Sequence, residues 1–192
     1  TYVPDDIFEA WLEGNDYGDG IPFNDSVLTS AISVITQLNL SNKNISDLTG
    51  ISDMLSLSSL SVDNNTLSIL DLTGLYELEY VGAYSNLLTQ VILPDSFSGT
   101  QWGCSYNIDH PYYAEYCGVN LDLGNNQITS FIAPPGLQIG RLELQNNPLN
   151  YLDILNAWSM GSINLSSTNL ASIDLSNHNY LRYIYLYNND SL

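Results

Sequence analysis

Apolar residues recur in register along residues 35–192, in the pattern L-x-x-L-x-L-x-x-N-x-L-x-x-L. Within each copy, two apolar residues flank one polar residue, as at Leu38 and Leu40, and this alternation is typical of a short strand with one buried face. The pattern occurs seven times, and the copies begin at Ile35, Leu57, Leu78, Gly118, Ile139, Met160 and Leu181. The steps between these starting residues are 22, 21, 40, 21, 21 and 21 residues. Because one copy cannot bury its apolar face alone, the period predicts a solenoid of stacked coils whose strands form a parallel sheet.

Two other features of the copies describe the rest of each coil. Asparagine occupies the ninth position of most copies, where its amide can bond to neighbouring backbone and form a ladder that Lys43 and Thr168 interrupt. A second apolar alternation follows at Leu70/Leu72, Val91/Leu93, Leu152/Ile154 and Ile173/Leu175. It predicts that the opposite flank consists of short extended strands or turns rather than long helices.

These copies resemble the leucine-rich repeat family over roughly residues 35–192. The closer similarity is to the 21-residue repeats of surface proteins from marine and gut Bacteroidetes and of related marine phage proteins. Their N-terminal caps resemble the motif Val3-Pro4-Asp5-Asp6-x-Phe8-Glu9-x-x-Leu12, and residues 45–51 (ISDLTGI) match a segment that often follows. The resemblance implies a β-rich α/β solenoid: a right-handed coil with a concave parallel sheet, a convex flank of short strands and an N-terminal helical cap. We expect the cap at residues 1–34 and seven coils at 35–192.

The two ends of the array differ in sequence. A helix is expected from about Asp5 to Glu13, because Asp6 and Glu9 have capping-box spacing and Gly14 supplies a stop. Its apolar stripe, which should cover the first coil, consists of Ile7, Phe8, Trp11 and Leu12. No comparable cap follows the last coil, so we expect either further sequence or self-association through this coil. The tyrosines that crowd it are Tyr180, Tyr183, Tyr185 and Tyr187.

The acidic segment after the cap helix suggests a calcium loop. Asp16, Asp19 and Asp25 are candidate ligands, because Ca²⁺ prefers oxygen donors at short spacing. The EF-hand pattern fails, however, since Tyr17 occupies a ligand position and no Glu closes the loop. A Gly/Asp turn is the favoured interpretation, so Ca²⁺ is kept only as a weak possibility and no other cofactor is expected.

An insertion interrupts the repeats at about residues 94–117, where the step is 40 residues. It is rich in aromatic residues, and loops of this length are usually functional or disordered. Two interpretations stay equally open: a binding loop, or a flap whose aromatic side chains cover apolar surface. Cys104 and Cys117 offer no complete zinc set, so a disulfide that staples this loop fits better and indicates an extracellular or cell-surface location.

Charge restricts the partners. Three basic residues stand against 21 acidic ones, for a net charge of −18, which argues strongly against nucleic acid and anionic membrane surfaces as partners. No stretch approaches the ~20 apolar residues that a membrane helix needs, so membrane insertion is not expected. The partners that remain are proteins and glycans.

The strand positions that face outward form the candidate binding surface. If the fourth and sixth positions point inward, the third, fifth and seventh are exposed, and they include two tyrosine patches and Arg141 and Glu143, which could pair. The third and fourth copies adjoin the insertion, whereas the patch at Tyr183, Tyr185 and Tyr187 is expected at the far end. Tyrosine and tryptophan supply contact area at low entropic cost. The predicted ligand-binding residues are Tyr80, Tyr84, Trp102, Tyr106, Tyr112, Tyr113, Asn120 and Asp122.

No catalytic motif appears, and an enzyme is not expected. Asp122 and Glu143 could stand on neighbouring strands, but an open sheet face should hydrate both and leave neither with the raised pKa that a general acid needs. Two classes remain: a non-catalytic extracellular recognition module, or a structural assembly unit of a surface layer, filament or virion that stacks through exposed repeat ends.

Overall fold

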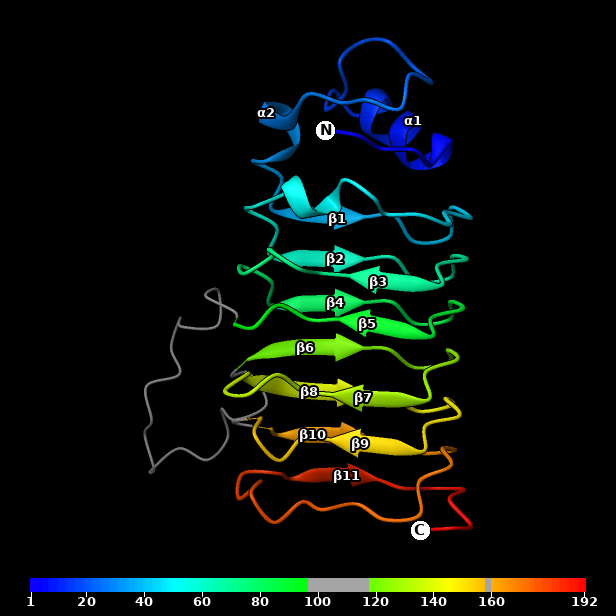
Figure 1. Cartoon of the computed structure of the whole chain (residues 1–192), viewed down its shortest axis with the longest axis vertical. Helices are drawn as coiled ribbons and strands as arrows, with labels where there is room; N and C mark the ends of the chain where they lie inside the picture. Colours follow the sequence, from blue (N-terminus) through cyan, green and yellow to red (C-terminus); the bar gives the residue numbers. More distant parts are fainter. Residues whose placement is uncertain (97–117, 158–159) are drawn as a thin grey trace.

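The computed structural model describes residues 1–96, 118–157 and 160–192. Each repeat contributes one strand to a seven-stranded parallel sheet, and the strands stack along the long axis of the molecule in chain order (Figure 1). The strands of this main sheet are β1 Gln37–Asn39, β2 Ser59–Ser61, β4 Tyr80–Gly82, β6 Val119–Asp122, β8 Ile139–Glu143, β10 Ser162–Asn164 and β11 Tyr183–Tyr185. The predicted solenoid of leucine-rich repeats is therefore confirmed.

The register of the main sheet also follows the repeat. The middle residue of each strand pairs with its equivalent in the next coil, so the inward side chains form one continuous row: Leu38, Leu60, Val81, Leu121, Leu142, Ile163 and Ile184. All of them are at most 2% exposed except Ile184, which is 46% exposed because β11 is the last strand of the sheet. Alternation then places the residues on either side on the outer face.

The opposite flank consists of two short parallel sheets whose strands run against those of the main sheet (Figure 1). They pair β3 Ile69–Asp71 with β5 Gln90–Ile92, and β7 Ser130–Ile132 with β9 Tyr151–Asp153. This confirms the expected extended flank. Among the described residues, Ile173 and Leu175 stand in the same alternation without forming a strand.

The ninth-position asparagines tie neighbouring coils together. The Asn126 side-chain amide donates to the carbonyls of Ala83 and Leu123, both at 3.0 Å, and its Oδ1 accepts the N–H of Leu88 at 3.0 Å. Asn65, Asn86 and Asn147 make equivalent bonds and are at most 7% exposed. Backbone groups inside the coil would otherwise be buried without partners.

The residue before each ladder position turns the chain with a left-handed conformation. Its φ lies between 54° and 60° in every copy, at Asn42, Asn64, Ser85, Asn125, Asn146, Ser167 and Asn188. Asparagine tolerates this region better than most residues, which explains the recurring Asn-Asn pair.

The cap contains helices α1 Asp6–Gly14 and α2 Thr29–Ile32, and a single turn, η1 Ile51–Asp53, lies in the first coil. Phe8 and Leu12 are fully buried, whereas Ile7 is 41% exposed, so the apolar stripe is narrower than predicted. The predicted capping box at Asp6 and Glu9 is wrong. Asp5 is the N-cap: its Oδ1 accepts the N–H groups of Ile7 and Phe8.

The cap is joined to the coils by one hydrophobic core. The buried cluster extends from Val3 in the cap to Leu170 in the sixth repeat. Asp5 adds a polar contact, because its second oxygen accepts the Ser46 N–H at 2.9 Å. In the part of the chain that the structure describes, no helix has the length and apolar character to cross a membrane.

Candidate binding site on the outer face of the main sheet

Side-chain size creates a hollow on the outer face of the main sheet. Tyr80 stands at one end and Tyr183 and Tyr185 at the other, while the strands between carry mostly short residues. We call this site the tyrosine hollow; its volume is about 490 Å³ and it is lined by Tyr80, Asn120, Leu121, Asp122, Arg141, Glu143, Ser162, Tyr183 and Tyr185. It spans five neighbouring strands, from β4 to β11.

Gly82 lets Tyr80 lie along the sheet. A Cβ added at Gly82 would come within 2.7 Å of the Tyr80 hydroxyl oxygen and 3.2 Å of the Asp63 carboxylate. The hydroxyl therefore occupies the space that a larger residue would fill, beside an acidic group. Burial raises the pKa of Tyr80, and the nearby charges of Asp63 and Asp122 raise it further, so the hydroxyl stays protonated and can donate a hydrogen bond.

The one guanidinium of the hollow is bound to a buried carboxylate. Arg141 Nε donates to Glu143 Oε1 at 2.7 Å, which confirms the predicted pair, and the Asn164 amide donates to the other Glu143 oxygen at 2.9 Å. The side chain of Glu143 is only 5% exposed, whereas that of Arg141 is 58% exposed. Both Glu143 oxygens thus have partners, and the hydrogen bond to Glu143 raises the pKa of Arg141.

Asp122 is far less well satisfied. It pairs directly with Glu143 in the sheet register, and the contact found for its carboxylate among the described residues is a 3.4 Å bond from the Gly124 N–H. Partial burial raises the pKa of Asp122, and the charges of Glu143 and Asp63 add to the effect. The expectation that an open sheet face would leave this pKa unraised is wrong, because the hollow removes water from a site that already holds several carboxylates.

The structure brings some of the predicted ligand-binding residues together and separates others. Tyr80, Asn120 and Asp122 line the hollow. Tyr84 does not; its ring lies over Gly124, where an added Cβ would come within 3.1 Å of Tyr84 Cδ2. Trp102, Tyr106, Tyr112 and Tyr113 lie outside the described residues, as does the predicted Cys104–Cys117 bridge.

Tyr183 and Tyr185 lie at the far end of the main sheet, as predicted, but they were not expected to share a site with Tyr80. They line the same hollow as Tyr80, although their copy is four strands away, and Arg141, Glu143 and Ser162 form the surface between them. The signal in the sequence was the size of the outward residues: small side chains in the fourth and sixth copies leave space between the large ones at the ends.

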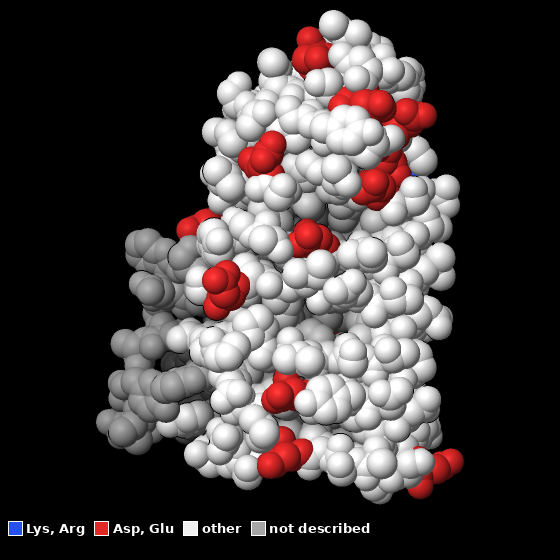
Figure 2. Space-filling view, viewed as in Figure 1, with Lys and Arg blue, Asp and Glu red and all other residues white. Residues whose placement is uncertain are grey.

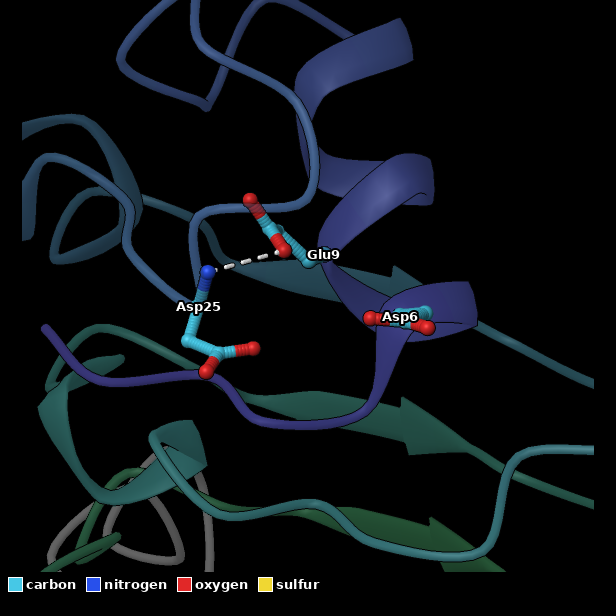
Figure 3. A group of neighbouring side chains, drawn as sticks. All are labelled: Asp6, Glu9 and Asp25. Carbon is cyan, nitrogen blue, oxygen red and sulfur yellow. Dashed lines mark hydrogen bonds between the residues drawn. The ribbon is translucent and has the colours of Figure 1, made fainter.

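Three carboxylates of the cap lie close together, but only one of them was a predicted calcium ligand. Oxygens of Asp6, Glu9 and Asp25 lie within 4.8 Å of one another (Figure 3). Glu9 is fully buried and accepts the N–H groups of Asn24 at 3.0 Å and Asp25 at 3.2 Å, so hydrogen bonds already account for its burial.

The other two calcium candidates are used differently. Asp19 accepts the Ile21 N–H at 2.9 Å and the Asn24 side-chain amide at 3.1 Å. Both bonds lower the pKa of Asp19, and the bond from Asn24 has the larger effect. Asp16 lies in a left-handed turn with φ 65°. Within the described residues, neither is grouped with Asp25, as the predicted calcium loop would require.

Together, the stacked coils, the inward leucine rows and the outer-face site define a leucine-rich repeat solenoid. A solved structure with a similar fold is the functional domain of InlJ from Listeria monocytogenes, which includes a cysteine ladder. The TM-score is 0.55 at 20% sequence identity, and the match covers 97% of this chain and 42% of that chain. The chain thus spans less than half of that neighbour, and the likeness shows the fold alone. No family model and no curated protein matches the chain.

Proposed function

We propose that this protein is a non-catalytic extracellular recognition module that binds a protein or a glycan through the outer face of its main sheet. One observation carries the proposal: tyrosines from the third and the last repeat line the two ends of one hollow whose floor is mostly polar. Tyr80, Tyr183 and Tyr185 are 38%, 48% and 38% exposed, so their rings are available for stacking. Binding energy in recognition surfaces concentrates in a few such aromatic anchors.

The insertion is proposed to complete this surface. It returns to the main sheet directly before β6, and Asn120, two residues after Gly118, already lines the hollow. Trp102, Tyr106, Tyr112 and Tyr113 would add stacking area at the end near Tyr80. A Cys104–Cys117 disulfide would stabilise the loop by roughly 3 kcal/mol in the chain-entropy model and would fit an extracellular location. Mass measurement after alkylation, with and without reductant, tests the bridge.

A catalytic role for the acidic residues is not favoured, despite the raised pKa of Asp122. Glu143, the carboxylate next to it, is held by Arg141 and Asn164 and has no free oxygen. A paired acid and nucleophile need both carboxylates available to the substrate. The arrangement therefore suits binding better than bond cleavage.

The proposal is tested by ligand screening with matched variants. Wild-type protein is applied to a glycan array and to cell-surface protein extracts, and every ligand found is re-measured with Tyr80→Ala and with Tyr151→Ala. Tyr151 is 51% exposed on the opposite flank and serves as the control. We expect Tyr80→Ala to weaken binding about tenfold and Tyr151→Ala to leave it unchanged. Equal binding by both variants would reject the site.

A second candidate is a structural assembly unit that stacks through its exposed repeat end. It is favoured by β11, where the inward-facing Ile184 is 46% exposed between Tyr183 and Tyr185. Sedimentation of the wild type and of Ile184→Ser distinguishes the two. Concentration-dependent association that Ile184→Ser abolishes supports assembly, whereas a wild type that stays monomeric at 0.1 mM, roughly the range of weak contacts, contradicts it.

A further inference from the structure

The charges around the tyrosine hollow do not balance. Asp63, Asp122 and Glu143 act on one small region, since both Asp63 and Glu143 influence Asp122, against the single guanidinium of Arg141. Glu143 accepts hydrogen bonds from Arg141 Nε and from the Asn164 side-chain amide. Asp63 accepts a hydrogen bond from the Tyr84 N–H at 2.8 Å. Among the described residues, Asp122 has one weak contact, the Gly124 N–H at 3.4 Å, while it lines the hollow. A ligand that brings a positive charge would remove this imbalance.

We propose that the tyrosine hollow binds an extended basic segment of a partner protein, with a lysine or arginine side chain seated between Asp122 and Tyr80. This inference rests on the proposed function and names the chemistry of its ligand. The hollow extends over four strand spacings, about 19 Å, which an extended segment of about six residues spans.

The tyrosines suit a cation as well as a carboxylate does. An ammonium or guanidinium group is attracted to the face of an aromatic ring, and the attraction strengthens where water is partly excluded. Tyr80 lies on the strand next to Asp122, and its hydroxyl lies over Gly82, the residue that pairs with Asp122, so a cation on the Asp122 carboxylate has this ring within reach. Tyr183 and Tyr185, three strands from Asp122, are left for the rest of the bound segment. A neutral glycan would use the rings and leave the acidic charge unpaired.

The rest of the molecule favours the same partner. Acidic side chains are spread over the face in Figure 2 from the cap to the last coil, and Lys and Arg hardly appear there. With a net charge of −18, the protein attracts basic segments from a distance and repels acidic ones. The field accelerates encounter, and the hollow provides the specific contact.

The test compares a nine-residue peptide of alternating lysine and serine with the same peptide in which every lysine is acetylated. Binding is measured by calorimetry at pH 7.5 in 150 mM NaCl. The variants are Asp122→Asn and Asp71→Asn. Asp71 lies on β3 on the opposite flank and its Oδ1 accepts the Thr73 N–H, a bond that asparagine keeps. Each variant removes one negative charge, so the two change the net charge equally and differ only in where the charge is lost.

We expect the lysine peptide to bind, the acetylated peptide to bind at least tenfold more weakly, and Asp122→Asn to weaken binding about tenfold while Asp71→Asn stays within twofold. Equal losses in the two variants would show attraction by net charge alone, and equal binding of the two peptides would exclude a cation; either result overturns the inference. No binding of the lysine peptide would also overturn it. If a ligand sensitive to Tyr80→Ala is nonetheless found on the array or in the extracts, the proposed function stands without the cation.

Discussion

At the scale of single residues, the ladder asparagines combine two tasks that apolar residues cannot. They fill the inside of each turn and satisfy N–H and carbonyl groups that face no strand partner. Asn126 alone bonds with Ala83 and Leu88 of the preceding coil and with Leu123 and Gly124 of its own coil. Loss of one such amide should therefore loosen two coils at once.

Asn126→Ala is expected to lower the free energy of unfolding by about 2–4 kcal/mol, because buried donors and acceptors lose their partners and a cavity replaces the amide. Asn150→Ala is the control: Asn150 is exposed, and its side chain makes no hydrogen bond with the described residues. Its effect should stay within about 0.5 kcal/mol. Urea denaturation of both variants measures the difference. Similar midpoints for the two would mean that the ladder contributes little.

Asp122 presents the opposite case, a residue of the proposed binding site whose partial burial should cost stability. Partial burial raises its pKa, with like charges adding to the effect, so the folded state binds a proton more tightly than the unfolded chain. Stability therefore falls as pH rises through the raised folded-state pKa. Binding sites often retain such groups.

Asp122→Asn should accordingly raise the thermal midpoint at pH 7.5 by about 1–3 °C, since screened like-charge contacts are worth about 0.5–1 kcal/mol. As pH is lowered toward 3.5, through the raised pKa of Asp122, the gain should shrink toward zero. Calorimetric scans across this range, with Asp71→Asn as the control for net charge, check the prediction. A lower midpoint at pH 7.5 would contradict it.

At the scale of elements, the sequence predicts the strands and their register well, because one inward side chain in every repeat decides both. The two flanking sheets follow from the same alternation. The cap was harder, since Asp5 and Asp6 are both suitable N-caps in the sequence, and Asp5 is also bonded to Ser46 and Asp47 in the first coil. Helix capping there depends on a contact that is distant in sequence.

The candidate site could be predicted only in part, for a related reason. The repeat identifies which residues face outward, so Tyr80, Asn120 and Asp122 were found. The repeat does not predict how deep the surface between these residues is. That depth depends on the sizes of the side chains over several coils and on the direction of the Arg141 side chain. For that reason the sequence separated Tyr183 and Tyr185 from Tyr80, and treated Asp122 as fully hydrated.

Two acidic residues of helix α1 hold the loop between α1 and α2, and each of them accepts hydrogen bonds from a different segment of that loop. Glu9 accepts the N–H groups of Asn24 and Asp25, and Glu13 accepts those of Asp19 and Gly20. Glu9→Ala should speed amide exchange at residues 24–25 about tenfold or more, and Glu13→Ala should do so at residues 19–20. Hydrogen exchange read by mass spectrometry resolves both segments. The same pattern in both variants would indicate general loosening of the cap instead.

At the scale of the whole molecule, charge should affect folding and the proposed binding in opposite ways. The chain carries 21 acidic and three basic residues, so the compact state is strained by repulsion among its own carboxylates. Salt screens these interactions: the Debye length falls from about 10 Å at 0.1 M to about 3 Å at 1 M. The core is apolar and continuous from the cap to the sixth repeat, so salt should affect the surface terms most.

Raising NaCl from 0.1 to 1 M should therefore stabilise the fold and weaken the proposed basic ligand. We expect the thermal midpoint to rise by a few degrees, roughly 1 kcal/mol of relieved repulsion, while the dissociation constant of the lysine peptide increases at least tenfold. Repeating the melts near pH 4, where many carboxylates are protonated, separates this effect from a general influence of salt on hydrophobic burial, because the rise should become smaller there. A midpoint that stays constant or falls with salt at pH 7.5 would mean that the acidic surface does not strain the fold. A peptide affinity that is unchanged in 1 M NaCl would place the binding energy in the tyrosines and remove Asp122 from the contact.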